Sequence, residues 1–169
     1  GIAGIGFNTR YLALKASTDN SLGISYGFPA IVYAADRNIP IINLSWGSGA
    51  WSQYGQDICN YATINKGVLL VAAAGNTFNT DLVYPASYEN VMSVAASQIM
   101  TDAWDYGNGT GTTHNYEVDI IAPGRSIMTT TGPTGFWIGS TGTSMSAPIV
   151  CGAVALVKSR YPGLSNTQA

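Results

Sequence analysis

The chain has 169 residues, of which 46% are hydrophobic and 9% are charged, and its formal net charge is −2. This length suits one domain with a single core, and the few scattered Lys and Arg residues form no basic patch for nucleic acid. No apolar run reaches the roughly 20 residues of a membrane span, and no signal-peptide pattern opens the chain, so an export signal would lie outside these residues. The low charged fraction favours a secreted or cell-surface protein.

Strands and helices are predicted to alternate along the chain. Five short apolar runs, several of them rich in Val and Ile, are typical of buried parallel strands. They lie at residues 10–15, 40–46, 68–74, 91–96 and 118–122. Apolar residues at helical spacing predict helices at 28–37 and 53–66, and Gly67 suits the position that follows the second helix. This alternation predicts an α/β fold with a parallel sheet.

The rest of the chain has a different character. Residues 99–117 are rich in Asp, Gly, Asn and Thr without any period, which predicts a surface excursion, with a hairpin as one option. A last helix is predicted at 144–161 and ended by Pro162. Residues 148–157 are apolar on every side, so we expect this helix to be buried all round. No repeat or linker divides the chain, and we expect a single domain, 1–169.

Ser144 stands where a glycine-containing loop meets this last helix. Free backbone N–H groups and the helix dipole favour negative charge at a helix start, so a nucleophilic hydroxyl there would have an oxyanion stabiliser beside it. Pro148 lies near the first turn, where its missing N–H group matters little. The structural alternative is that Ser144 is an ordinary helix N-cap.

Asn76 follows the small-residue run at 72–75, at the end of a predicted buried strand. Ligands of parallel α/β sheets lie at the carboxyl ends of strands, which makes this carboxamide a candidate site residue. The alternative is a simple turn, in which Asn is common.

Taken together, the motifs resemble those of the subtilase family of serine peptidases over nearly the whole chain. Six blocks occur in the family's order, at residues 1–4 leading into 11–15, then 42–47, 73–76, 84–86, 122–124 and 142–148. The resemblance implies a three-layer fold with a mostly parallel sheet flanked by helices. It also implies a secreted serine endopeptidase that acts on extended peptide segments.

The resemblance assigns roles to individual residues. Ser144 would be the nucleophile, and its backbone N–H and the side chain of Asn76 would bind the oxyanion. Substrate would pair with an edge segment formed by Ser45, Trp46 and Gly47 and with an opposite strand formed by Asn20, Ser21 and Leu22. The pocket for the residue before the cleaved bond would be walled by Ala73, Ala74 and Gly75. Gly142 and Thr143, which precede the nucleophile, would also contact the substrate. Val83 falls where many relatives have Gly, so the pocket floor should be shallower.

The family's catalytic Asp and His motifs would precede Gly1 and are not in this sequence. The single histidine, His114, has the surroundings of a solvated loop residue. We therefore expect this chain alone to be inactive, as a piece of the catalytic domain cut at both ends, because nothing activates Ser144.

Uncovered sheet edge and apolar surface would favour self-association of such a piece. A catalytically silent peptide-binding module is the alternative, and a nucleotide-binding fold lacks its glycine motif.

Metal and thiol chemistry receive little support. Calcium is common in the family, and a calcium ion in the full-length protein is compatible with the resemblance. Asp81, Asp102 and Asp105 are too isolated to form a cluster, so we expect no metal site and no cofactor in this chain. Cys59 and Cys151 match neither a zinc nor a redox spacing, which favours two buried free thiols, with a disulfide as the alternative in a secreted protein.

Overall fold

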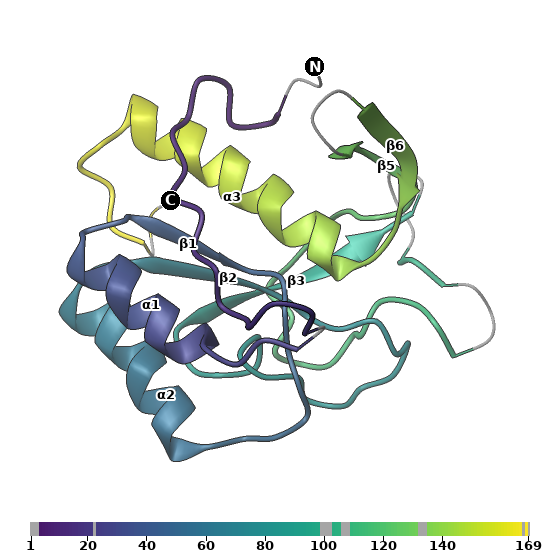
Figure 1. Ribbon diagram of the computed structural model, residues 1–169, viewed down its shortest axis with the longest axis horizontal. Coiled ribbons are helices and arrows are strands. Elements are labelled where there is room, and N and C mark those ends of the chain that lie inside the picture. Colours follow the sequence, from purple (N-terminus) through teal and green to yellow (C-terminus); the bar gives the residue numbers. More distant parts are fainter. Residues whose placement is uncertain are drawn as a thin grey trace.

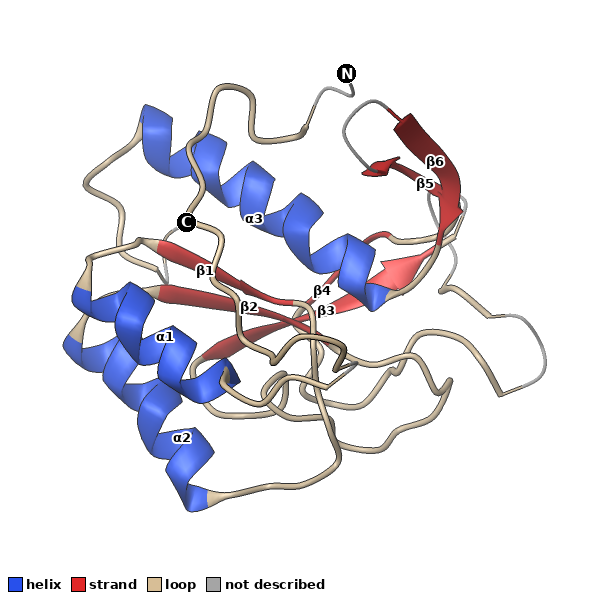
Figure 2. Ribbon diagram, in the orientation of Figure 1, coloured by secondary structure: helices blue, strands red, loops and turns tan. Residues whose placement is uncertain are grey.

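A four-stranded parallel sheet forms the centre of the computed structural model, which describes residues 4–21, 23–98, 103–105, 109–131, 135–166 and 168 (Figures 1 and 2). The strands lie in the order β1 (Ile41–Leu44), β2 (Leu69–Ala73), β3 (Val91–Ser97) and β4 (Ile120–Pro123). All three pairings are parallel. Four of the five predicted strands are therefore confirmed.

Helices cover both faces of this sheet (Figure 2). One face carries α1 (Gly27–Asp36) and α2 (Gln53–Asn60), which continues into a π-helical turn, η1 (Tyr61–Asn65). The other face carries α3 (Thr143–Arg160), which packs on all four strands. Gly67 follows η1 with a φ angle of +66°, as its predicted place after the helix requires. The predicted α/β fold with a sheet between helical layers is confirmed.

The middle of the sheet is its most buried part. All five residues of β2 are buried, since β2 lies between β1 and β3 with helices on both faces. Leu70 and Ala72 point into the core beneath α1 and α2, whereas Leu69, Val71 and Ala73 point into the core beneath α3. This alternation explains why the strand reads as a continuous apolar run. Its carboxyl end is fixed by the pairing of Ala73 with Val94.

The prediction of a strand at 10–15 was wrong. These residues are extended but belong to no sheet. A groove of about 1090 Å³ lies between residues 9–12 and 39–43, so the segment runs beside β1 without hydrogen-bonding to it. Composition predicted the extended backbone. A strand also needs a hydrogen-bonded neighbour, and among the described residues none pairs with 10–15.

The excursion is less superficial than predicted. Thr112 and Thr113 are fully buried, and an isolated antiparallel bridge joins Asp105 to Gly111. The option of a hairpin in this excursion stays a prediction, since residues 99–102 and 106–108 lie outside the described residues and the Asp105–Gly111 bridge is compatible with it. A two-stranded antiparallel sheet lies later in the chain, formed by β5 (Ile127–Thr131) and β6 (Gly135–Ser140).

The last helix is buried on one side only. Val150 and Val154 face the sheet, whereas Leu156 is 42% exposed and Val157 is 36% exposed. The expectation of burial all round was therefore wrong for this chain. Within the described residues, no helix combines the length and the apolar character needed to cross a membrane.

Both cysteines are free thiols, which settles the open choice against a disulfide. Cys59 is fully buried in the core beneath α1 and α2, and Cys151 is half-buried on α3. Desolvation is the main cause that raises the pKa of each thiol to about 12. Because the thiolate is the reactive form, both should be inert near neutral pH.

We therefore predict slow alkylation of the folded chain by iodoacetamide at pH 8 and rapid alkylation of both thiols in 6 M guanidinium. Site-resolved mass spectrometry measures both rates. Rapid modification of Cys59 without unfolding would contradict the burial described here.

Candidate active site

Two chain segments meet at the carboxyl edge of the sheet. Asn76 follows β2 by three residues, and Ser144 is the second residue of α3. The helix N-cap is Gly142, whose φ angle of +145° is one that residues with side chains rarely adopt. Ser144 is thus not the N-cap, so that alternative was wrong, and its hydroxyl is not used in capping the helix.

Thr143 fixes the orientation of the Asn76 carboxamide. Asn76 Oδ1 accepts hydrogen bonds from the backbone N–H of Thr143 at 2.9 Å and from Thr143 Oγ1 at 3.0 Å. Thr143 Oγ1 in turn accepts one from the backbone N–H of Gly75 at 3.2 Å. Since the oxygen is occupied, the amide nitrogen is the end left for a ligand. Within the described residues, no group accepts a hydrogen bond from Asn76 Nδ2.

Gly142, the N-cap of α3, lies directly beside the Asn76 carboxamide. A Cβ atom added to Gly142 would lie 3.4 Å from both Nδ2 and Oδ1 of Asn76. The glycine therefore allows close approach as well as the unusual φ angle. The carboxamide and Ser144 therefore lie on the same edge of the sheet, joined through Gly142 and Thr143.

Ser144 and Ser45 hold one another across the end of β1. The Ser45 hydroxyl donates to the carbonyl of Ser144 at 2.9 Å, and the Ser144 hydroxyl donates to the carbonyl of Ser45 at 3.4 Å. Ser144 is half-buried, so its hydroxyl is accessible from one side. A nucleophile placed here lies at a helix N-terminus, where developing negative charge is stabilised.

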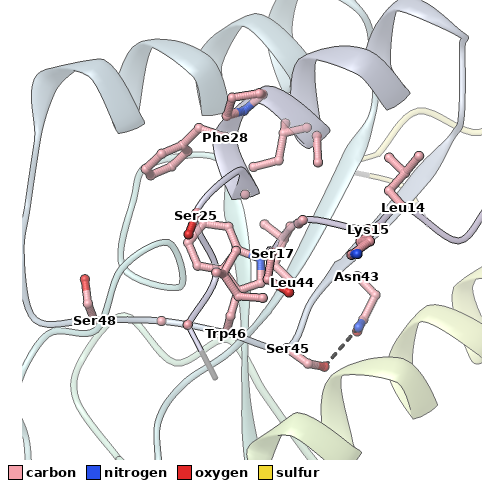
Figure 3. Close-up of a pocket in the computed structure, with 18 of the residues that line it drawn as sticks. Leu14, Lys15, Ser17, Ser25, Phe28, Asn43, Leu44, Ser45, Trp46 and Ser48 are labelled. Carbon is pink, nitrogen blue, oxygen red and sulfur yellow. Dashed lines mark hydrogen bonds between the residues drawn. The ribbon is translucent and has the colours of Figure 1, made fainter. Parts of the chain in front are cut away.

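The predicted edge segment lines a groove of about 1180 Å³ (Figure 3). Ser45, Trp46 and Gly47 form one side of it, and Phe28 packs edge-on against Trp46 with ring centroids 5.5 Å apart. Gly27 leaves room for the indole, since an added Cβ would lie 2.6 Å from a Trp46 ring carbon. The groove therefore has an aromatic wall next to the segment at 45–47, which follows β1.

The opposite side of this groove differs from the prediction. Asn20 and Ser21 are exposed and lie at a turn with no strand, and Leu22 lies outside the described residues. Residues 12, 14–17 and 23–25 line the groove instead. The positive φ angle of Asn20, +61°, explains the turn, because Asn tolerates the left-handed region.

Val83 fills the space between two glycines. Atoms of its side chain lie 2.7 Å from a Cβ built on Gly47 and 3.0 Å from one built on Gly75. Ala73 and Ala74 are buried behind them. The predicted walls, floor and edge segment are therefore neighbours, and the valine occupies the room that glycines on either side leave open.

The remaining titratable candidates do not join this site. His114 is exposed, shares a hydrogen bond between its Nδ1 and the carbonyl of Thr112, and packs on Phe78, as expected of a loop residue. Asp81 accepts a hydrogen bond from Asn79, and Asp102 lies outside the described residues. Among the described positions there is no cluster of three or more His, Cys, Asp or Glu side chains that would hold a metal ion.

Sequence reasoning assigned Thr143 to substrate binding and missed its contact with Asn76. The signal was present in part, because a Thr in the first turn of a helix capped by Gly has a hydroxyl free for a tertiary partner. Nothing local identified that partner, which is 67 residues away.

We predict that Thr143→Val lowers the free energy of unfolding by about 1–3 kcal/mol, since the half-buried backbone N–H of Gly75 loses its acceptor and Asn76 Oδ1 loses one of its two donors. Thr143→Ser keeps the hydroxyl and should retain most of the stability. Urea unfolding followed by circular dichroism compares the two variants. A larger loss in Thr143→Ser than in Thr143→Val would show that the methyl group, not the hydroxyl, is what matters.

Known proteins match this chain in sequence over nearly its whole length. The family model described as "Subtilase family" matches residues 1–169. The chain is 42% identical over 162 residues to the Thermophilic serine proteinase of Bacillus sp. (strain AK1), covering 95% of this chain and 38% of that protein. It is 39% identical to Thermitase of Thermoactinomyces vulgaris, over 100% of this chain and 58% of that protein. Subtilisin BL of Lederbergia lenta is 34% identical, over 99% and 60% respectively.

The chain thus spans about 38–60% of the length of these curated relatives. The residues that the family model matches include the loop after β2, the edge segment after β1 and the start of α3. The chain belongs to the subtilase family.

Proposed function

We propose that this chain supplies the nucleophile, the oxyanion site and the substrate cleft of a serine endopeptidase. The observation that carries the proposal is the fixed Asn76 carboxamide beside the helix start that bears Ser144. The names of the relatives, a serine proteinase and a subtilisin among them, support the same class of reaction.

In the proposed reaction the Ser144 oxygen attacks the peptide carbonyl carbon, and its proton passes to a general base. The carbonyl oxygen becomes an oxyanion that accepts from Asn76 Nδ2 and from the backbone N–H of Ser144. The carbon–nitrogen bond then breaks, the amine leaves with the proton, and water later hydrolyses the acyl-enzyme. The base would come from a His motif upstream of Gly1, oriented by an Asp.

Substrate would bind in extended form. The segment at 45–47 presents backbone groups along the groove, and main-chain pairing there would give affinity without reading the side chains. The aromatic wall of Phe28 and Trp46 would favour an apolar substrate residue in the groove. Val83 would restrict the pocket for the residue before the cleaved bond to small side chains, since it fills the space between Gly47 and Gly75.

A peptide-binding module without activity is the second candidate. It is favoured by one observation, namely that the Ser144 hydroxyl donates to the Ser45 carbonyl and not to an imidazole within the described chain. For either function we place the protein outside the cell, because its charged fraction is low. We propose no cofactor for this chain, although calcium in a longer form is compatible with its family.

A fluorophosphonate probe separates the two functions. The chain alone should show no rapid labelling, because the serine lacks its base, whereas a longer form with the upstream Asp and His motifs should label stoichiometrically. Ser144→Ala should abolish labelling. A longer form that binds peptide but never labels would support the silent module, and fast labelling of the chain alone would contradict the need for a base.

Asn76→Ala tests the oxyanion site in that longer form. It should lower kcat about 100- to 1000-fold with little change in KM, because the carboxamide would bind the oxyanion and not the ground-state carbonyl; this range is the one known for the corresponding loss in subtilisin itself. Steady-state hydrolysis of a chromogenic peptide measures both constants. A rise in KM with kcat unchanged would place Asn76 in substrate binding instead.

Val83→Gly tests the pocket floor. We predict a gain in kcat/KM of roughly tenfold or more for peptides with Phe or Leu before the cleaved bond, because removing the valine opens volume for apolar contact. Peptides with Ala at that position serve as the internal control and should change little. A uniform change for all peptides would show that Val83 does not line the pocket.

A further inference from the structure

Pro148 removes a hydrogen bond from the residue that carries the nucleophile. It is the sixth residue of α3, beyond the first turn where the sequence analysis had placed it. In an α-helix the N–H of residue 148 would donate to the carbonyl of residue 144, and proline has no N–H. The carbonyl of Ser144 therefore lacks its helical donor, and a partly buried carbonyl without a partner is costly.

Ser45 supplies the missing donor from another part of the chain. Its hydroxyl donates to the Ser144 carbonyl at 2.9 Å, across 99 residues of sequence. Asn43 Nδ2 donates to Ser45 Oγ at 2.9 Å, as the dashed line in Figure 3 marks. Since that amide nitrogen can only donate, it engages the oxygen of Ser45 as an acceptor and leaves the hydroxyl proton for Ser144.

The series of donors extends one residue further. Cys151 Sγ lies 3.7 Å from Asn43 Oδ1, which holds the amide oxygen toward α3 and the amide nitrogen toward Ser45. In each of the three contacts the donor is the residue nearer to Cys151 along the path. Donation therefore runs from Cys151 on α3 through Asn43 and Ser45 at the end of β1 to the carbonyl of Ser144. The two ends of this path, Cys151 and Ser144, are about two turns apart on the same helix.

We propose that the side chains of Asn43 and Ser45 are positioning residues that fix the backbone of Ser144 where Pro148 has released it. The proposal rests on the proposed function insofar as it takes Ser144 to be the nucleophile. The backbone of Ser144 sets both the place of the hydroxyl and the direction of the N–H that would bind the oxyanion. Small displacements of such groups are costly for a reaction that depends on alignment.

This role is distinct from the backbone role proposed for the edge segment. Pairing with a substrate uses the N–H and carbonyl groups of residues 45–47, whereas positioning uses the hydroxyl of Ser45. A change that removes only the hydroxyl therefore separates the two.

A double-mutant cycle between Ser45 and Pro148 is the direct test. Ser45→Ala should lower the melting temperature by roughly 2–4 °C, since it leaves the Ser144 carbonyl unpaired. Pro148→Ala restores the helical N–H, so in that background the same change should cost less than about half as much. Ser159→Ala, an exposed serine on the same helix, is the matched control and should be additive with Pro148→Ala. Additivity of Ser45→Ala with Pro148→Ala would overturn the proposal.

Chemical reactivity provides a second readout that a purely stabilising contact would not move. In a Ser144→Cys chain the introduced thiol lies at a helix N-terminus, where the thiolate is favoured. Ser45→Ala should slow its alkylation at pH 7 by about threefold to tenfold and move the pH midpoint of the reaction upward, whereas Ser45→Thr should restore the rate. Peptide mapping separates this thiol from Cys59 and Cys151. An unchanged rate and midpoint in Ser45→Ala would contradict positioning.

Asn43→Ala gives the same test if Ser45→Ala does not fold, because it removes only the amide that orients the hydroxyl. Its effect on the introduced thiol should have the same sign, and no effect would count against the proposal. Neither readout needs a base or a substrate. If fluorophosphonate labelling fails in every form of the protein, the endopeptidase proposal fails while the cycle still decides the role of Ser45.

Discussion

The two hydrogen bonds that Asn76 Oδ1 accepts from Thr143 are the constraint on which the site depends. They join the loop after β2 to the first residue of α3, and they leave the amide nitrogen as the free end of the carboxamide. Gly142 makes the contact possible, because its missing side chain and its φ angle of +145° let the helix start approach the loop. Without this junction, Ser144 would still lie in the first turn of α3 but would face no fixed donor.

The second junction, between Ser45 and Ser144, places the same helix start against the end of β1. Two strand ends and one helix start are thus held together by polar contacts at one edge, whereas the bodies of the strands and of α3 are held by apolar packing. This division explains how small residues at 73–75 and 142–143 are compatible with a rigid site. Because these residues are small, the backbones of the loop and of the helix start lie close together. The side chain of Val83 then fills part of the space beside Gly47 and Gly75.

Much of this fold was predictable, because the apolar runs of β2 and β3 are long, buried on both faces and separated by clear helical patterns. The position of Asn76 at a strand end and of Ser144 near a helix start followed from the same reasoning.

Residues 10–15 have the composition of a strand, but composition does not reveal whether a neighbour is within hydrogen-bonding distance. The alternative of Ser144 as the N-cap was wrong, because α3 begins at Thr143 and Gly142 is its N-cap. The contacts that could not be predicted are the long-range polar ones, Thr143 with Asn76 and Ser45 with Ser144. They span 67 and 99 residues, and serine and threonine have too many local partners for sequence to select a distant one.

Amide hydrogen exchange of the ¹⁵N-labelled chain, followed by NMR, tests the central junction most directly. We predict a protected backbone N–H at Thr143, because Asn76 Oδ1 accepts from it, together with fast exchange of the Asn76 side-chain amide protons, because Asn76 is exposed. In Asn76→Ala the protection at Thr143 should disappear while that of β2 persists. A Thr143 amide that exchanges as fast as an open loop, or protected side-chain amide protons at Asn76, would contradict it.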